Sequence, residues 1–578
     1  MGSWWRGPAV ALTLVLLAVG LGGTPASAAP GVPLPQETAT SAPAEPSPTD
    51  EATEAEPGES ATPTEDPTSD EPSPPASEPP SVPTPTPTAT SALPPPPSTV
   101  SPSPAPTGGP TIGELEPVPP ALADPPASPT SWVPAVVALV AGLAIGLVLR
   151  RRQSRAAIRR TPAPAPPPPA GDESAAALAA LEAIGEAMTD AGYSMAAVRQ
   201  SLEEISATNG YPATEIVAFP TALIVSARGL GDVRTGAVSS GRRELFFSQT
   251  DALDDLVVEA RTTPTRASAI TARIAGIRAM PEPYPLAVRV LAYVAASAGI
   301  AVLLGASWGG TGLSTVLGAG VGWAQISAER LREQFRALVT VGSAFVVTLV
   351  VLLLTTAGHD PGLLPSVIGP LVIFLPGGLL TIGALELTTQ HMMSGAGRVA
   401  AGAMQLVLLA VGIVGAAALV GVPRLELVGS AQPIGPVGPW VAVAVFGVGI
   451  VVHQCGRLRS IGWILLVLYV AYSAQVLGDI LFGGALSAFV GAFAMTPVAA
   501  LVARQPSGPA ALVSFLPAFW LLVPGSLGLV GVASILDGNA AGVNTLLTTA
   551  STMVAIALGT LAGAAVSSRL SPDRPSLL

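Results

Sequence analysis

Long hydrophobic runs separated by short polar connections fill the chain from residue 285 onward. A run of about 20 apolar residues is long enough to cross a bilayer as a helix. The pattern therefore predicts ten membrane spans. They lie near 285–305, 309–326, 337–356, 363–387, 398–420, 437–453, 460–477, 482–503, 510–533 and 543–566.

Two earlier segments have different patterns. Residues 132–149 form one more apolar run, and the Pro-rich linker that follows, 150–170, contains six arginines. Residues 171–283 show helical periodicity at 173–188, 195–208, 251–260 and 267–279. Runs rich in β-branched and aromatic residues at 214–220, 221–227 and 243–249 predict strands. We expect one further transmembrane helix at 132–149 and a small cytosolic α/β domain at 171–283.

The first 131 residues combine a secretory signal with a low-complexity segment. Arg6, a short apolar stretch and Ala26-Ser27-Ala28 predict a signal peptide over residues 1–28, with an uncleaved anchor as the alternative. Residues 30–131 hold 31 of the chain's 61 prolines and have little apolar surface to bury. We expect 29–131 to be a disordered extracytoplasmic stalk, serving either as a cell-wall contact or as a solvated spacer.

Composition narrows the functional classes. The formal net charge is −11, but 15 acidic residues lie in 30–131, and the rest of the chain sums to +4. All 27 basic residues are arginines, so the lysine of a Walker A phosphate loop is absent. Cys455 is the only cysteine, which leaves no intrachain disulfide or cysteine metal site. With no metalloprotease or serine-hydrolase motif either, we predict no enzyme activity, cofactor, metal or nucleic-acid partner.

The arginines indicate how the spans are oriented, because basic residues stay on the cytoplasmic side of a membrane. If residue 284 is cytoplasmic, nine arginines fall in inner loops and one, Arg424, falls in an outer loop. The nine are Arg330, Arg332, Arg336, Arg398, Arg457, Arg459, Arg504, Arg569 and Arg574. We therefore predict a multi-pass protein of the cell membrane, with 29–131 outside and both 150–284 and the C-terminus in the cytoplasm.

Proline and glycine interrupt two predicted spans at matching places, in FLPGGLLTIGALEL (374–387) and LLVPGSLGLVGVASIL (521–536). At an offset of 148, six residues of the first region equal six of the second. Leu364, Ser366, Pro376, Gly377, Leu379 and Gly383 match Leu512, Ser514, Pro524, Gly525, Leu527 and Gly531. We interpret this as an internal duplication with halves at 285–420 and 437–566.

Five spans in each half would insert the second half upside down relative to the first. Such inverted repeats are typical of secondary transporters, in which helices broken at corresponding positions form the substrate site. The freed backbone groups would then face a solute, because lipid offers them no partners. The alternative is that the prolines only kink packed helices and the small residues only allow close helix contact.

Polar residues inside the spans are candidates for function, because a charge in lipid is costly. Glu386 lies ten residues beyond Pro376 and could bind an ammonium group or carry a proton; the alternative is a place at the cytoplasmic lipid boundary. His453 is either a titrating group or an interfacial histidine. Four amides are equally consistent with substrate binding and with helix contacts, namely Gln405, Gln475, Asn539 and Asn544.

Three segments resemble the signatures of the threonine/serine exporter family: GYPATEIVAFPTALIVSARG (210–229), LPGGLLTIGALELTTQHMMSGAGRVAAG (375–402) and ALVSFLPAFWLLVPGSLGLVGV (511–532). The resemblance covers about 171–567 and leaves out 1–149. It implies proton-driven efflux of threonine and serine. It also implies roles for Pro220 and Thr221 in the cytosolic domain and for Pro376, Gly377, Glu386, Ser394, Gly395, Arg398, Pro517, Pro524 and Gly525 in the membrane.

Two functions are consistent with the sequence. The first is a secondary exporter of threonine, serine or small peptides that alternates access between its halves and is coupled to protons through Glu386. The second is a non-transporting envelope protein whose stalk and cytosolic domain relay a signal. The paired breaks and the number of spans favour the exporter.

Overall fold

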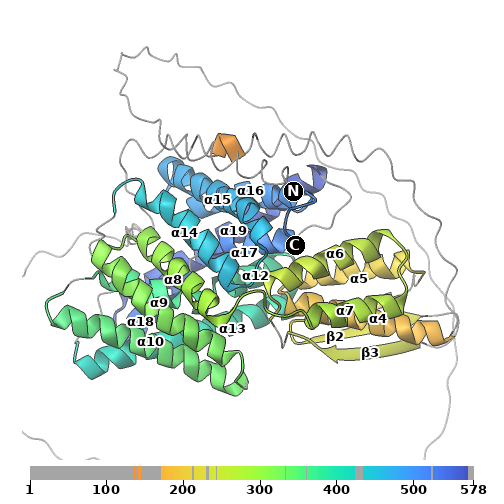
Figure 1. Cartoon of the computed structure of the whole chain (residues 1–578), viewed down its shortest axis with the longest axis horizontal. Coiled ribbons are helices and arrows are strands. Elements are labelled where there is room, and N and C mark those ends of the chain that lie inside the picture. Colours follow the sequence, from red (N-terminus) through yellow and green to blue (C-terminus); the bar gives the residue numbers. More distant parts are fainter. Residues whose placement is uncertain are drawn as a thin grey trace, which may run out of the picture. The chain divides into compact units, whose positions relative to one another are not determined.

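The computed structural model describes residues 136, 139–142, 144, 171–210, 214–228, 233–241, 244–331, 333–359, 361–422, 434–522 and 525–570. The predicted signal peptide (1–28), stalk (29–131) and linker (150–170) lie outside these residues. Of the predicted span 132–149, the six described residues are helical. Within the described chain, a domain of four helices and a small sheet adjoins a large helical bundle (Figure 1).

The N-terminal domain contains α4 (Gly171–Asp190), α5 (Met195–Thr208), α6 (Phe247–Thr262) and α7 (Ala267–Arg278). Its sheet is antiparallel in the order β1 (Thr214–Phe219), β2 (Ala222–Arg228), β3 (Val233–Ser239). Leu223 and Val225 on β2 are fully buried, whereas Val217 and Ile224 are exposed. This alternation buries one face of the sheet beneath the helices and leaves the other open.

The predicted strand at 243–249 is wrong. The third strand is β3, which pairs with β2 from Ala222↔Ser239 to Arg228↔Val233. Residues 244–246 are not part of a strand, and α6 begins at Phe247, with the Phe246 N–H bonded to the Gln249 side chain. The Arg289 guanidinium lies over the Phe246 ring, with its central carbon 5.2 Å from the centre of that ring. The aromatic pair that suggested a strand therefore anchors the start of a helix.

The bundle begins with α8 (Leu286–Leu303), α9 (Trp308–Ala328) and α10 (Glu333–Thr356). A broken segment follows, made of α11 (Leu363–Leu371), the 3₁₀ turn η2 (Val372–Phe374) and α12 (Gly377–Thr388), and then α13 (Met392–Val420). The rest comprises α14 (Gly438–His453), η3 (Leu458–Ser460), α15 (Ile461–Phe482), α16 (Gly484–Val502), α17 (Ala511–Leu522), α18 (Gly525–Leu536) and α19 (Ala541–Leu570).

Each of the ten spans predicted after residue 285 coincides with one helix or one broken pair. Among the described residues, six helices are long and apolar enough to cross a membrane, and two bent pairs raise the number to as many as eight. The pairs are α11–η2 with α12, bent by 63°, and α17 with α18, bent by 45°. The protein is thus a multi-pass helical membrane protein. The span assignments of α9 and of α14, which has only 16 residues, stay predictions.

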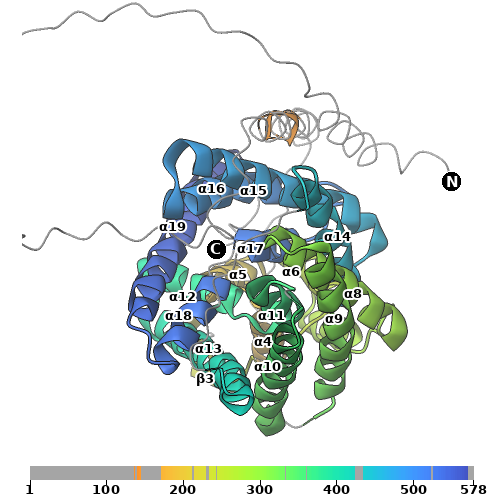
Figure 2. The ribbon, with the colours of Figure 1, turned by 90° about the vertical axis from the view of Figure 1, so that its left-hand side faces the viewer.

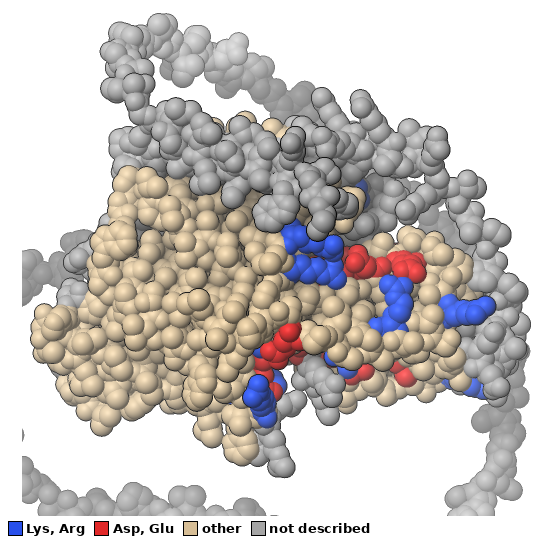
Figure 3. Space-filling view, in the orientation of Figure 1, with Lys and Arg blue, Asp and Glu red and all other residues tan. Residues whose placement is uncertain are grey.

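The short broken helices occupy the middle of the bundle. In Figure 2 the longer helices α8–α10, α13–α16 and α19 surround α11, α12, α17 and α18. Every residue of α11 after Leu363 is buried, as are Gly525–Gly531 of α18. On the face drawn in Figure 3, the described charged side chains gather over the N-terminal domain and its border with the bundle, and the bundle beyond that border displays none.

The two broken pairs share helix boundaries at an offset of 148 residues. Adding 148 to the ends of α12 gives the ends of α18, and adding 148 to the start of α11 gives the start of α17. Equivalent pairs also pack together: α12 with α13 and α18 with α19, α10 with α13 and α16 with α19.

Helices α8 and α14 form the most extensive of the contacts between the halves. A Cβ atom on Gly299 would lie 2.9 Å from Ala442 O, and one on Gly449 would lie 2.5 Å from Ala292 O. Residue numbers therefore rise along α8 where they fall along α14, so these equivalent helices are antiparallel.

Candidate functional site

The break between α11 and α12 is supported by side chains from neighbouring helices. Pro370 has no N–H to continue the helical hydrogen bonds. The Tyr293 hydroxyl, fully buried on α8, donates to Pro370 O at 2.6 Å and accepts from Ile373 N at 3.4 Å. Gln405 donates to Phe374 O at 3.3 Å. Side chains from α8 and α13 thus satisfy backbone groups that the break frees.

Three polar side chains meet beyond this break, where α12 lies against α13. Glu386 is 1% exposed, Ser394 3% and Arg398 8%. The Ser394 hydroxyl donates to Glu386 Oε2 at 2.5 Å, and Arg398 Nε lies 3.2 Å from the same oxygen. A carboxylate, a guanidinium and a hydroxyl thus form one buried cluster inside protein rather than at a lipid-facing surface.

Two glycines set the spacing of this cluster. A Cβ atom on Gly395 would lie 2.7 Å from Gly383 O and 2.8 Å from Leu387 N. Because real side chains do not approach backbone so closely, only glycine lets α12 and α13 pack at this distance. Gly395 thereby allows Ser394 and Arg398, which flank it on α13, to reach Glu386.

The N-terminal domain completes the cluster with main-chain groups. Glu386 Oε1 accepts the N–H of Met195 at 2.9 Å, and Arg398 Nη2 donates to the carbonyl of Tyr193 at 2.9 Å. Met195 is the first residue of α5, so the positive end of that helix faces the Glu386 carboxylate. Met195 and Glu386 lie 191 positions apart in the chain, and Tyr193 and Arg398 lie 205 apart. Segments that are distant in sequence thus form one site.

Thr381 lies on α12 between the break and Glu386. Its side chain is 3% exposed, and among the described residues its hydroxyl has no hydrogen-bond partner. A buried hydroxyl without a partner is destabilising. Thr381 is therefore a polar group that a ligand could satisfy.

The other predicted site residues occupy different places. Pro376 precedes α12 and Gly377 begins it, while Gly525 begins α18; Pro524 lies outside the described residues. Pro517 is inside α17, the helix whose Leu516 approaches Gly378 at the first break. Asn539 is exposed, and its side chain accepts the N–H of Ala541 at the start of α19. The break residues thus lie near α17, and Asn539 acts as a helix cap.

Pro220 and Thr221 form the two-residue turn between β1 and β2. The Thr221 carbonyl accepts the N–H of Ser240, and a Cβ atom on Gly241 would lie 2.3 Å from Pro220 O. These contacts bring the turn together with the end of β3. They do not involve the Glu386 cluster.

His453 is fully buried at the end of α14. Its Nδ1 lies 3.1 Å from Arg289 O, and its Nε2 lies 3.0 Å from the side-chain oxygen of Gln325. Arg289 is itself paired with Glu282 and Glu329. His453 is thus part of a polar network that joins α8, α9 and α14.

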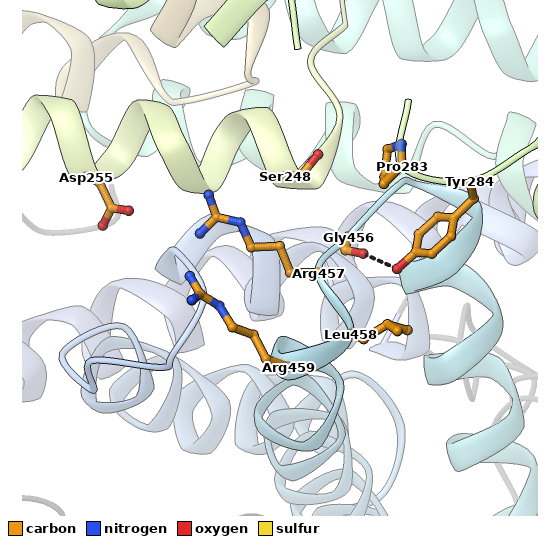
Figure 4. Close-up of a pocket in the computed structure, with 8 residues that line it drawn as sticks. All are labelled: Ser248, Asp255, Pro283, Tyr284, Gly456, Arg457, Leu458 and Arg459. Atoms are coloured by element: carbon orange, nitrogen blue, oxygen red, sulfur yellow. Dashed lines mark hydrogen bonds between the residues drawn. The ribbon is translucent and has the colours of Figure 1, made fainter. Parts of the chain in front are cut away.

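A separate open pocket of about 750 Å³ lies between α6 and the loop that joins α14 to α15. Arg457 and Arg459 extend from the loop toward α6, which carries Ser248 and Asp255 (Figure 4). The Tyr284 hydroxyl holds the loop by donating to Gly456 O at 2.8 Å. The pocket contains none of the residues proposed from sequence.

Sequence reasoning identified Glu386, Ser394 and Arg398 but missed Tyr293, Thr381 and the main chain of 193–195. A tyrosine within an apolar span signals a buried hydroxyl that needs a partner. Thr381 gave a weaker signal, because a threonine in a helix usually bonds to the carbonyl four residues before it. Nothing in a sequence marks a main-chain donor.

Residues 180–420 match a family model described as "Putative threonine/serine exporter". No curated protein and no solved structure matches the chain. The matched range contains the first break, the Glu386 cluster and the segment of the N-terminal domain that contacts it. Residues 180–420 of this chain are thus similar to the threonine/serine exporter family.

Proposed function

We propose that this protein is a secondary exporter of threonine and serine, and that Glu386, Ser394 and Arg398 receive the amino acid. The observation that carries the proposal is the buried pair Glu386–Arg398, held on α12 and α13 within the part of the chain that matches the exporter family. Buried charges in a membrane bundle are costly and are kept where they serve function.

The chemistry of the cluster matches an α-amino acid. A guanidinium binds a carboxylate through two parallel hydrogen bonds, so Arg398 would take the substrate carboxylate. Glu386 would take the ammonium group. The side-chain hydroxyl of threonine or serine would then bond to the hydroxyl of Ser394 or to that of Thr381, which has no partner among the described residues. This assignment explains a preference for small hydroxy amino acids.

Glu386 also provides a route for proton coupling. Binding of a zwitterionic substrate leaves the net charge of the site unchanged, whereas a proton taken up by the Glu386 carboxylate in place of the Arg398 ion pair raises it by one. Inward movement of a proton through Glu386 would then reset the carrier after it releases its substrate outside.

The arrangement of the helices supports two inverted halves. The helix boundaries repeat at an offset of 148, and the equivalent helices α8 and α14 are antiparallel. In an inverted repeat the loop at 357–359 would be outside, and its equivalent at 505–507 would be in the cytoplasm. The two halves would alternate access by rocking against one another around the broken helices.

Efflux of threonine tests the function. Cells loaded with a threonine dipeptide should release threonine faster with the protein than without it. Glu386→Gln should lower the rate at least tenfold because it removes the charge yet keeps an acceptor for Met195 N–H. Glu329→Gln is the matched control, since Glu329 pairs with Arg289 outside the site. Equal release with and without the protein would favour the envelope-protein alternative.

Cysteine labelling tests the inverted repeat. His359 and Pro506 are both exposed, and Cys455→Ser removes the only native cysteine. A membrane-impermeant maleimide should label His359→Cys in intact cells, and Pro506→Cys only after permeabilisation. Labelling of both from the same side would contradict the inversion while leaving the efflux result unaffected.

A further inference from the structure

We infer that the main chain of Tyr193–Met195 occupies the amino-acid site as an intramolecular pseudosubstrate, which a cytoplasmic amino acid must displace. The inference rests on the proposed function and concerns regulation of the same site. It assigns the N-terminal domain the role of closing the carrier from the cytoplasmic side.

The contacts of this segment reproduce those expected for a free amino acid. Arg398 Nη2 donates to the Tyr193 carbonyl, where a substrate carboxylate oxygen would accept. Glu386 Oε1 accepts the Met195 N–H, where a substrate ammonium would donate. A carbonyl and an N–H of one short peptide segment thus take the two charged partners that an amino acid needs.

The residue between these groups is a serine. Ser194 is the N-cap of α5, and its hydroxyl accepts the N–H of Ala197 at 3.2 Å. The segment is held in place by its domain, because the Tyr193 hydroxyl also donates to Asp254 at 3.0 Å. The pseudosubstrate is therefore preformed, so its binding orders little additional chain.

A free zwitterion would bind the cluster more strongly than neutral peptide groups, because charge-assisted hydrogen bonds are the stronger ones. At low concentration the segment would hold the site closed, and at high concentration the amino acid would replace it. The apparent affinity for substrate is reduced by the fraction of protein in which the site is free. The domain thereby sets the cytoplasmic concentration at which export begins.

The Met195 N–H can be removed without disrupting α5. Met195 is the first helical residue, a position where proline is common and where the N–H has no partner within the helix. Ser194 already has the extended conformation (φ −66°, ψ 150°) that a residue before proline adopts. Met195→Pro therefore deletes the donor to Glu386, and Met195→Ala is the matched control that loses the side chain but keeps the donor.

Two measurements on the full-length protein in nanodiscs, with threonine as the probe, test the inference. Met195→Pro should bind threonine at least fivefold more tightly than Met195→Ala by calorimetry. In the wild type, saturating threonine should increase hydrogen exchange at the amides of 193–197. Equal affinities of the two variants, or weaker binding by Met195→Pro, would overturn the inference.

The outcomes separate the inference from the function on which it rests. Threonine that binds the wild type without changing exchange at 193–197 would overturn the pseudosubstrate and leave the exporter intact. Threonine that binds only Met195→Pro would support both. Threonine that binds no form of the protein would overturn the function and the inference together.

Discussion

Asp251 and Ala510 join the N-terminal domain to the second half of the bundle. Asp251 Oδ1 accepts the N–H of Ala510 at 2.8 Å, immediately before the first turn of α17. Arg457 Nε lies 3.8 Å from the other carboxylate oxygen. Leu512 on α17 belongs to the same hydrophobic cluster as Leu253 on α6. The domain therefore holds one broken helix of each half, α12 through Met195 and α17 through Asp251.

The first prediction concerns pH. Burial raises the pKa of Asp251 from its ordinary 3.8 to about 6, with Asp254 and Asp255 adding to the rise and the Ala510 N–H and Arg457 opposing it. The folded protein thus binds more protons than the unfolded chain between these pH values, so stability falls as pH rises from about 4 to about 6. The ionised carboxylate costs about 3 kcal/mol at neutral pH.

Asp251→Asn should remove this cost while keeping the acceptor for Ala510. We expect a higher melting temperature than wild type at pH 7.5, with the difference shrinking as pH falls and the two converging near pH 4. Glu203→Gln is the control, because that carboxylate is exposed and pairs with Arg199 on the same helix. Parallel pH profiles of wild type and Asp251→Asn would contradict the assignment.

The second prediction concerns the first break. Tyr293→Phe removes the hydroxyl that bonds both Pro370 O and Ile373 N, and leaves these buried groups without a partner. The expected loss of stability is about 1–3 kcal/mol, measured as a lower melting temperature. Tyr472→Phe is the control, since Tyr472 packs edge-on against Trp440 and removing its hydroxyl leaves Pro370 O and Ile373 N paired with Tyr293. Similar losses in both variants would show that the hydroxyl does not support the break.

The third prediction concerns the packing of α12 on α13. The Cβ of Gly395→Ala would meet backbone atoms of Gly383 and Leu387, so the helices must separate. Overpacking of this kind costs about 1–3 kcal/mol, and the movement of Ser394 and Arg398 away from Glu386 should reduce threonine efflux. Gly397→Ala is the control on the same helix, because a Cβ there meets nothing within 4 Å. Unchanged efflux in Gly395→Ala would separate the helix spacing from the site.

The bundle was predictable from sequence because its pattern is long and physically strict. Apolar runs must be helical in lipid, which satisfies every backbone group, and each of the ten spans predicted after residue 285 coincides with a helix or broken pair. Pro376 and Gly377 marked the break because they interrupt such an apolar run and free backbone groups that lipid cannot satisfy. The strand predicted at 243–249 failed because Phe246 and Phe247 pack against the bundle, and a local pattern carries no information about that distant surface.

The candidate site was only half predictable. The family signature pointed to Glu386, Ser394 and Arg398 through residues close together in sequence. The donor and acceptor from 193–195 arise from tertiary docking, and any residue type there has the same main-chain groups. For Asn539 the sequence left a substrate role and a helix contact equally open, and the structure shows its side chain bonded to the start of α19.

The last prediction separates stability from function at Thr381. Thr381→Val keeps the shape of the side chain and deletes a buried hydroxyl that lacks a partner among the described residues. The folded protein should therefore be as stable as wild type or more so, because an unsatisfied hydroxyl costs about 1–3 kcal/mol. If that hydroxyl bonds to the substrate, threonine efflux should nevertheless fall several-fold, and selectivity for threonine over valine should fall with it. Thr348→Val on α10 removes another fully buried hydroxyl, also without a partner in the described part of the chain, and should leave both efflux and selectivity unchanged. Loss of efflux in both variants would indicate a general packing effect, and normal selectivity in Thr381→Val would remove Thr381 from the site.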